Sequence, residues 1–421
     1  MLQVIGSSWA LLLGMLLLML GNGLQGTLLG VRGGIEGFST LEMSVVMSAY
    51  FAGFLFGSRA TPAMIRRVGH VRVFAALASF VSAVLILYPL LVHPVAWIIG
   101  RVIIGFCFSG VYVTAESWLN NSTDNQNRGK ALSAYMIVQM FGVVAAQYLL
   151  ILGDPSGYML FVLASVAVSI SFAPILLSIS PTPPFDTAKP MTLKQLYRVS
   201  PLGCVGMFLM GGIFAAQFGM SAVYGTVAGL SVAQISIFVS AFYIGAVIMQ
   251  YPIGWISDRM DRRVLIFIMG ALGGAASVLA VLTGGQFEIL LAAAFLIGGT
   301  SNPLYALLLA YTNDFLDADD MAAASGGLIF LNGVGAIIGP PLTGWMMEAR
   351  GPGGFFAFIA ALLFGIALYA AWRMTQRSND TTTEDTAVYA PVMPTASPVA
   401  VEVAQEYYAD ATSEEGDDRA A

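Results

Sequence analysis

The chain has 421 residues, of which 57% are hydrophobic and only 10% are charged. A soluble domain carries roughly 25% charged residues, so this composition excludes a soluble enzyme, a secreted domain and a nucleic-acid-binding protein. The net charge of −6 is distributed unevenly, because most of the acidic excess lies in the C-terminal tail. Ten acidic residues and one basic residue, Arg419, lie from Ser378 to Ala421, so this tail carries −9 and the remainder carries +3.

Apolar stretches long enough to cross a bilayer recur along the chain before this tail. A membrane-spanning helix needs about 20 mostly apolar residues, and inside lipid only regular helix satisfies the backbone of such a segment. A cleaved leader is the alternative for the first stretch, although a basic start and a typical cleavage site are lacking. The sequence predicts twelve spans, at residues 5–30, 41–60, 71–92, 95–118, 131–153, 156–179, 200–224, 232–256, 263–284, 288–311, 322–347 and 353–373.

The tail is predicted to be disordered, because it is rich in Thr, Pro, Ala and Glu and has no apolar period. A short induced helix near Val401–Tyr408 is the alternative. Between the sixth and seventh spans a proline-rich stretch predicts a linker between two halves. Its prolines are Pro181, Pro183, Pro184 and Pro190.

Basic residues gather in alternate connections between the spans. Fourteen lie beside loops 2–3, 4–5, 6–7 and 8–9 and at the start of the tail, whereas the other loops hold Arg32 and Arg350. Cytoplasmic loops are enriched in Lys and Arg, so both termini and the linker are predicted to be cytoplasmic, in a bacterial-type inner membrane. The fourteen are Arg59, Arg66, Arg67, Arg72, Arg128, Lys130, Lys189, Lys194, Arg198, Arg259, Arg262, Arg263, Arg373 and Arg377.

The two halves of the chain repeat each other. Residues 48–53 read SAYFAG and residues 240–245 read SAFYIG, a separation of 240 − 48 = 192, which also relates Gln25 to Gln217. A duplicated six-helix unit is therefore predicted, and one large class of secondary transporters places its site between two such halves. With a slip of one residue, the matches extend to Tyr112 and Tyr305, Asn120 and Asn313, and Gly142 and Gly335.

Two loops and one span carry motifs. The loop between spans 8 and 9 has Gly254, Asp258, Arg259, Arg262 and Arg263, with Asp261 between them. The loop between spans 2 and 3 has the more degenerate set Pro62, Arg66, Arg67, Gly69 and His70. Span 4 reads Arg101-x-x-x-Gly105-x-x-x-x-Gly110.

These motifs resemble the loop signature and the span-4 arginine motif of the major facilitator superfamily, over nearly all of residues 1–376. The family has Gly where Asp261 stands, and Asp where Arg66 stands. The stretches LGNGLQGTLLG, AESWLNN, LYRVSPLG and PLYALLLAYTND are similar to a bacterial branch, the YcaD-like transporters. The resemblance implies an all-α integral membrane protein whose twelve transmembrane helices form two pseudo-symmetric six-helix bundles.

The implied division places the first bundle at 1–180, a cytoplasmic linker at 181–200, the second bundle at 201–376 and the acidic tail at 377–421. The loop residues would act in gating. In this family spans 1, 4, 7 and 10 line a central cavity, which makes their polar residues candidates for the substrate site; hydrogen bonding between helices is the alternative. With Tyr243 of span 8, these candidates are Asn22, Gln25, Arg101, Tyr112, Gln217, Tyr243, Asn302 and Tyr305.

Two ionisable residues lie well inside predicted spans, and such residues are functional candidates because burying a charge in lipid is unfavourable. Arg101 is a candidate to bind an anionic group of the substrate or to bias a nearby proton site. The alternative is a structural role, with its side chain reaching to the membrane interface. Glu116 lies 15 residues further along the same span, about 22 Å away, so the two do not pair. An ion pair of Glu116 with Arg66, Arg67 or Arg128 is predicted, with proton carriage as the alternative.

The function predicted from these features is alternating-access transport of a small organic solute, neutral, amphiphilic or anionic, with proton coupling left open. The alternative is a transporter-like accessory or sensor protein that binds a solute without moving it. We expect no enzymatic activity and no cofactor. No metal site is expected, since His70 and His93 are isolated, and no ATP-driven transport is expected, since no phosphate-binding loop is present. The expected partners are the solute and the bilayer, for a monomeric protein that does not bind nucleic acid.

Overall fold

The computed structural model of the chain describes residues 2–122, 128–177, 191–316, 318–376, 389–393, 395–397, 400–401 and 404. The helices of the first half are α1 (Leu2–Ile35), α2 (Thr40–Val68), α3 (His70–Leu90), α4 (Pro94–Ser122), α5 (Arg128–Leu152), α6 (Met159–Ser171) and α7 (Ala173–Leu177). Those of the second half are α8 (Leu193–Val199), α9 (Pro201–Ala215), the π-helix η1 (Ala216–Met220), α10 (Ser221–Val227), α11 (Val232–Ser257), α12 (Arg262–Leu282), α13 (Phe287–Asn313), α14 (Ala318–Arg350) and α15 (Gly354–Gln376).

The prediction of an all-helical membrane protein with twelve spans is confirmed, because twelve segments of the described chain are long and apolar enough to cross a bilayer. The sixth segment joins α6 and α7, and the seventh joins α9, η1 and α10 over Pro201–Val227. The second helix extends beyond the predicted end at residue 60 and includes Arg66 and Arg67 in its last turn. Basic side chains are favourable there, since they meet the negative end of the helix dipole.

The second span of each half begins in the same way. Ser39 precedes α2 and exchanges hydrogen bonds with Glu42, while Ser231 precedes α11 and exchanges hydrogen bonds with Gln234. In each capping box the serine hydroxyl accepts from the backbone of the third residue, whose side chain accepts from the serine N–H. The two boxes lie 231 − 39 = 192 residues apart, so the repeat extends to the signals that start these helices.

Glycines at equivalent positions allow close contact within each bundle. Gly53 of α2 packs on the backbone of α4 at Val102, and Gly245 of α11 packs on the backbone of α13 at Phe295. A Cβ atom on either glycine would collide with the carbonyl oxygen opposite. Small residues let helix backbones approach closely in membranes, so α2–α4 and α11–α13 form the same tight pair in the two halves.

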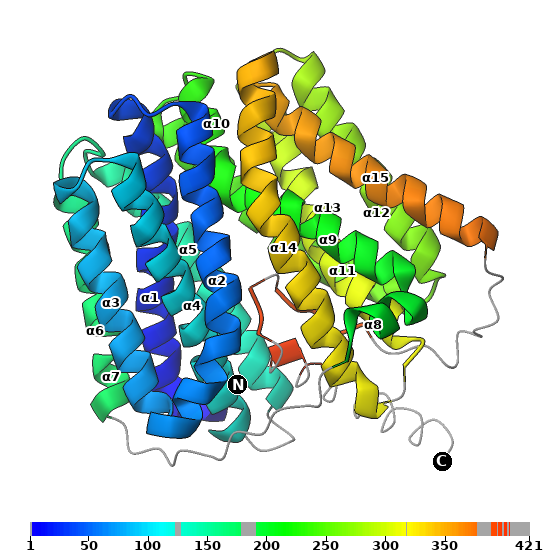
Figure 1. The fold of residues 1–421 in the computed structure, drawn as a ribbon, viewed down its shortest axis with the longest axis horizontal. Helices are drawn as coiled ribbons and strands as arrows, with labels where there is room; N and C mark the ends of the chain where they lie inside the picture. Colours follow the sequence, from blue (N-terminus) through cyan, green and yellow to red (C-terminus); the bar gives the residue numbers. More distant parts are fainter. Residues whose placement is uncertain are drawn as a thin grey trace.

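The two bundles stand side by side (Figure 1). Helices α2 and α14, α5 and α11, and α1 and α10 make contact between them. We call the end of the molecule with the loops at 66–72 and 257–263 the basic end. At the opposite end small residues close the gap, with Gly30 against Ala222 and Gly344 against Ser44.

The linker contains one described helix, α8, which begins with a capping box between Thr192 and Gln195 and buries Leu196. The remainder of the linker, up to residue 190, lies outside the described residues. The exact bundle limits, 1–180 and 201–376, therefore stay a prediction.

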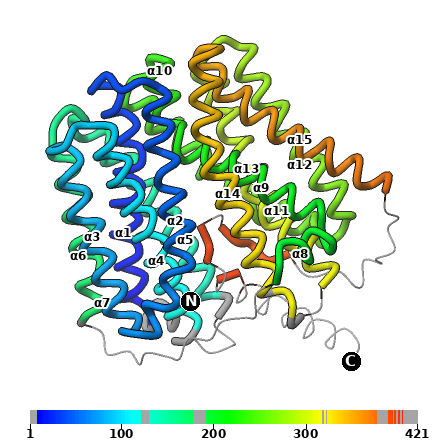
Figure 2. Tube along the Cα trace, in the orientation of Figure 1, coloured from blue at the N-terminus to red at the C-terminus, as the bar shows by residue number. Residues whose placement is uncertain are grey.

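Part of the tail is packed, which differs from the predicted disorder. Residues 389–393, 395–397, 400–401 and 404 are all buried or half-buried, and the tube in Figure 2 places them between the two bundles, toward the basic end. The reason is local composition, since no charged residue occurs from Ala387 to Val401. Ala400, Val401 and Ala404 are helical, and most of the alternative short helix near 401–408 lies outside the described residues. The other tail residues lie outside the described chain.

Candidate functional site

A central cavity of about 160 Å³ lies between the two bundles. Helices from both halves contribute to it: α1, α2, α4 and α5 on one side, and the seventh span, α11, α13 and α14 on the other. Aromatic side chains form much of its wall, among them Phe51, Phe54, Phe214 and Phe218. A mostly apolar wall with a few polar groups is typical of a small-molecule site.

Arg101 supplies the cationic group of this cavity. It is only 4% exposed, and its Nη1 donates to Gln25 Oε1 at 2.9 Å. Its guanidinium lies 4.7 Å from the ring centroid of Tyr50, a cation–π contact. Nε of Arg101 has no hydrogen-bond partner, and no acidic residue in the described chain forms a salt bridge with it. A buried cation without a counter-charge is costly, so this group is suited to an incoming anion.

Amide side chains surround this cation. Gln25 donates to Asn22 Oδ1 at 3.1 Å, so its oxygen is turned to Arg101 and its nitrogen to Asn22. On the opposite wall, Asn302 donates to the Gly298 carbonyl and Asn332 donates to the Met207 carbonyl. The cavity thus offers hydrogen-bonding groups from both halves.

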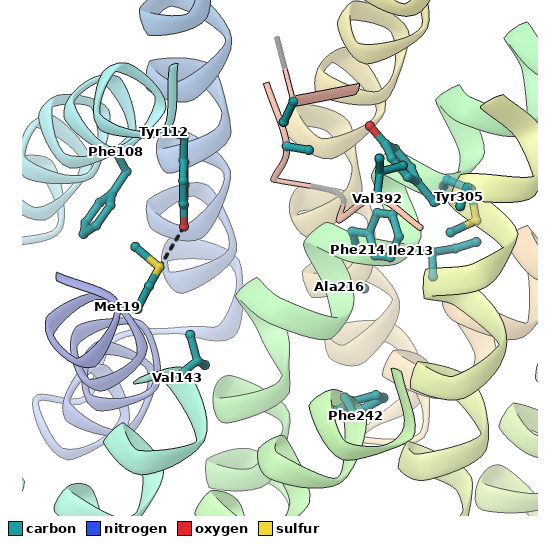
Figure 3. Close-up of a cluster of buried hydrophobic side chains, with 14 of the residues drawn as sticks. Met19, Phe108, Tyr112, Val143, Ile213, Phe214, Ala216, Phe242, Tyr305 and Val392 are labelled. Atoms are coloured by element: carbon teal, nitrogen blue, oxygen red, sulfur yellow. Dashed lines mark hydrogen bonds between the residues drawn. The ribbon is translucent and has the colours of Figure 1, made fainter. Parts of the chain in front are cut away.

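Five of the eight predicted cavity residues line the cavity: Asn22, Gln25, Arg101, Tyr243 and Asn302. Tyr112, Gln217 and Tyr305 do not line it and are buried within their own bundles. The Tyr112 hydroxyl donates to Met19 Sδ at 3.2 Å, as the dashed line in Figure 3 shows. Tyr305 is fully buried, with its ring 5.7 Å from that of Phe214.

Gln217 needs a separate correction, because its symmetry with Gln25 predicted that both side chains would face a substrate. Its Nε2 donates to Ser301 Oγ at 3.0 Å, and it is 0% exposed. The residue lies in η1, a π-helical turn. Gln25 lies instead in the continuous α-helix α1, so the local helix geometry differs between the halves and position in the repeat did not determine orientation.

The predicted set missed several lining residues. Tyr50 and Phe51 lie in the repeated stretch 48–53, and Phe51 matches Tyr243 at the separation of 192. Because Tyr243 was a predicted cavity residue, this match could have identified Phe51 as a second one, and both rings line the cavity. Gln147, which donates to the Gly23 carbonyl at 3.3 Å, had no comparable sequence signal.

A second, apolar groove of about 790 Å³ opens between α5 and α11. Its walls include Ile137, Phe141, Val247 and Ile248, whose side chains are exposed at the outer surface of the bundles. The groove and the central cavity share the lining residues Met140, Tyr243, Asn302 and Met393. The two spaces are therefore neighbours, one polar at Arg101 and one apolar toward the lipid side.

At the basic end of the second bundle, Arg262 forms a buried ion pair with Asp314 and lies 3.7 Å from Asp258. Arg259 instead stacks on Trp255 and donates to its carbonyl. Burial raises the pKa of Asp258, against the lowering effects of the Tyr389 N–H and the nearby arginines. The ion pair that joins α12 to the end of α13 is made by Arg262.

Two further residues of this loop have separate contacts. Arg263 and Asp261 form an ion pair at 2.8 Å. Burial opposes ionisation of Asp261, but hydrogen bonds from Arg263 outweigh it and hold the pKa of Asp261 below its usual value. Gly254 packs against the Tyr389 ring of the tail. The predicted gating loop is thus in contact with the tail.

The first bundle has a different arrangement at its basic end. Arg66 and Arg67 are exposed at the end of α2, and Gly69 follows with φ 85°, a value that favours glycine. Glu116 is 4% exposed and accepts hydrogen bonds from Tyr135 Oη at 3.2 Å and from the Ser397 N–H at 2.8 Å. The predicted ion pair is therefore wrong for Arg66 and Arg67, and the Arg128 side chain lies outside the described residues.

The comparisons with known proteins agree with this architecture. A family profile described as Major Facilitator Superfamily matches residues 11–233 and 202–401. The chain is 26% identical over 363 residues to the uncharacterized MFS-type transporter YcaD of Escherichia fergusonii, covering 84% of this chain and 92% of that protein. It is 28% identical over 365 residues to YcaD of Escherichia coli O6:K15:H31, with the same coverage.

Solved structures of low sequence identity share the fold. The nucleoside transporter NupG gives a TM-score of 0.71 at 14% identity, covering 89% of this chain and 99% of that one. The Major Facilitator Superfamily transporter FucP, in the outward conformation, gives 0.54 at 15% identity, covering 86% and 98%. Two six-helix bundles, a cavity between them and a profile that matches most of the sequence lead to one conclusion: the chain belongs to the Major Facilitator Superfamily.

Proposed function

We propose that this protein is a secondary transporter that carries a small organic anion with an apolar portion by alternating access. The observation that carries the proposal is Arg101, a buried cation in a cavity between two bundles, with Nε unpaired. A carboxylate or phosphate would supply the missing partner, and hydrogen bonds between charged groups are stronger than neutral ones. The fold shared with a nucleoside transporter and with FucP supports transport.

The apolar portion of the solute would lie against the aromatic wall. Phe51, Phe54 and Phe218 line the cavity next to the polar groups, and the neighbouring groove between α5 and α11 extends the apolar surface. An inorganic anion would leave this surface unused. We propose the basic end as the cytoplasmic end, in agreement with the excess of Lys and Arg in its loops.

The test is flux into liposomes that contain the purified protein. A panel of aromatic and aliphatic carboxylates is compared with the corresponding neutral amides, with and without a pH gradient, which also reports proton coupling. Wild-type protein is expected to favour a carboxylate over its amide. Arg101→Gln is expected to lower the affinity for the carboxylate by about 10- to 100-fold, the loss of a charged hydrogen bond of about 1.5–3 kcal/mol, and to leave the amide unaffected.

Arg59→Gln is the matched control, because Arg59 is an exposed cation that stacks on Phe330 and does not line the cavity. Equal flux of acids and amides in wild-type protein would contradict an anionic solute. Binding of a carboxylate without any flux would contradict transport and favour the accessory or sensor role.

A further inference from the structure

The described residues of the tail, 389–393, 395–397, 400–401 and 404, lie where the two bundles separate at the basic end (Figures 1 and 2). We call the stretch that they mark segment 389–404. Most described side chains of this segment are buried: Tyr389 is 5% exposed, and Val401 and Ala404 are 0% exposed, whereas Pro391, Met393 and Thr395 are half-buried. Figure 3 draws Val392 of the tail in the same cluster of buried side chains as Phe214 and Tyr305 of the second bundle. The segment is therefore part of the packed interior.

The backbone of this segment bonds to one carboxylate in each bundle. The Tyr389 N–H donates to Asp258 Oδ1 at 3.2 Å, and Asp258 follows α11 in the second bundle. The Ser397 N–H donates to Glu116 Oε2 at 2.8 Å, and Glu116 lies in α4 of the first bundle. The segment thus spans the opening and joins the two halves.

The fit is close on both sides. The Tyr389 ring packs on Gly254, where an added Cβ would lie 2.7 Å from the ring. Near Glu116, Ala396 and Ala400 line a remaining space of about 10 Å³ together with Tyr135. A space of this size holds at most one water molecule, so larger side chains at the two alanines would not fit.

The segment also reaches the candidate substrate site. Met393 and Thr395 line the central cavity that holds Arg101. Met393 lines the apolar groove between α5 and α11 as well. A solute that entered from the basic end would meet the tail before it met Arg101.

We propose that the opening at the basic end is a binding site for the chain's own segment 389–404, and that this segment must leave before the two bundles can close at that end. The proposal rests on alternating access, since closure would bring together the surfaces at Glu116 and Asp258 that now hold the tail. A segment on the same chain binds at an effective concentration on the order of millimolar. Two backbone hydrogen bonds and a few small apolar side chains therefore suffice to hold it.

The experiment measures access to the cavity and needs no solute. A single cysteine is placed at Ser58, which lines the cavity, after the buried Cys107 and Cys204 are replaced by alanine. Labelling by a membrane-impermeant maleimide is followed in purified protein. If the tail is bound between the bundles in nine molecules out of ten, only one full-length molecule in ten exposes the cysteine. A chain that ends at Arg377 is then expected to label about tenfold faster than the full-length chain. A synthetic peptide of residues 387–404 at about 1 mM is expected to restore the slow rate.

Ala400→Trp keeps the tail but places a side chain too large for the space beside Glu116. Its cysteine at position 58 is therefore expected to label as fast as that of the truncated chain. Ala411→Trp, the same change outside segment 389–404, is the matched control and is expected to label slowly. A cysteine at the exposed Ser156, in the loop between α5 and α6, reports any general loosening and is expected to label at one rate in all variants. Equal Ser58→Cys labelling in full-length, truncated and Ala400→Trp protein would overturn the proposal, whatever the flux experiment shows.

Discussion

Gln25 and Gln217 occupy equivalent places in the two bundles, yet their surroundings differ. Gln25 faces the cavity and accepts a hydrogen bond from Arg101, whereas Gln217 is bonded to Ser301 inside the second bundle. The position that matches Arg101, 294 − 101 = 193 residues later, is Ala294, which is fully buried. The halves therefore share their packing, whereas among the described residues that line the cavity the cation comes from the first half alone. Duplicated helices thus do not imply a duplicated binding site.

The largest expected effect concerns the shared packing. Gly105 of α4 lies against the Tyr50 carbonyl, and Gly298 of α13 lies against the Phe242 carbonyl. Gly105→Val and Gly298→Val are each expected to lower the free energy of unfolding by about 3 kcal/mol, the upper range for overpacking. Thermal unfolding in detergent measures this. Gly326→Val is the control, because Gly326 has open space around it; tolerance of one change but not the other would show that the halves pack differently.

The second prediction concerns the basic end, where the halves use different chemistry. Arg262 and Asp314 form a buried ion pair in the second bundle, whereas His70 bonds to Ser117 at 3.0 Å in the first. Removing one member of a buried pair leaves an uncompensated charge, although Asp258 lies close enough to Arg262 to offset part of it. Asp314→Asn is expected to destabilise the protein by about 2–3 kcal/mol, and Ser117→Ala by about 1 kcal/mol.

Both changes are measured by thermal unfolding of the purified protein in the same detergent. A larger loss of stability for Ser117→Ala than for Asp314→Asn would contradict the prediction, because it would mean that the ion pair contributes less than the neutral hydrogen bond. Glu288→Gln serves as a charge-removal control, since Glu288 is in the exposed first turn of α13 and forms no salt bridge with the described residues.

The smallest expected effect separates the two glutamines. Gln25→Leu is expected to weaken binding of the transported carboxylate about tenfold, because Arg101 loses its only oxygen acceptor in the described chain. Gln217→Leu is expected to leave binding unchanged and to lower the free energy of unfolding by about 1 kcal/mol, because Ser301 loses a partner. Binding of the carboxylate and thermal unfolding are measured on both variants. Equal losses of affinity would contradict the prediction and indicate that both glutamines contact the substrate.

The course of the helices could be predicted from the sequence because hydropathy and spacing determine it. Twelve apolar stretches of this length are expected to form membrane-spanning helices, as the structure has them. The repeated motif at residues 48–53 and 240–245 predicted that the helices of the two halves are equivalent. The orientation of Gln217 could not be predicted, since a π-helical turn leaves no pattern in five residues of sequence. The tail was misjudged because its acidic average concealed the uncharged stretch from Ala387 to Val401.

The contacts that close the opposite end have an energetic consequence. Gly30 meets Ala222 and Gly344 meets Ser44 there, so at these two points the bundles touch through backbone and very small side chains, beside a buried apolar cluster of Val31, Ile235 and Val239. Because the hydrophobic effect scales with apolar area, at about 25 cal/mol per Å², separating the two glycine contacts exposes little apolar area to water, and the apolar cost of opening this end falls on that cluster. A solute that binds one facing state more tightly than the other can shift their populations by no more than that difference in affinity.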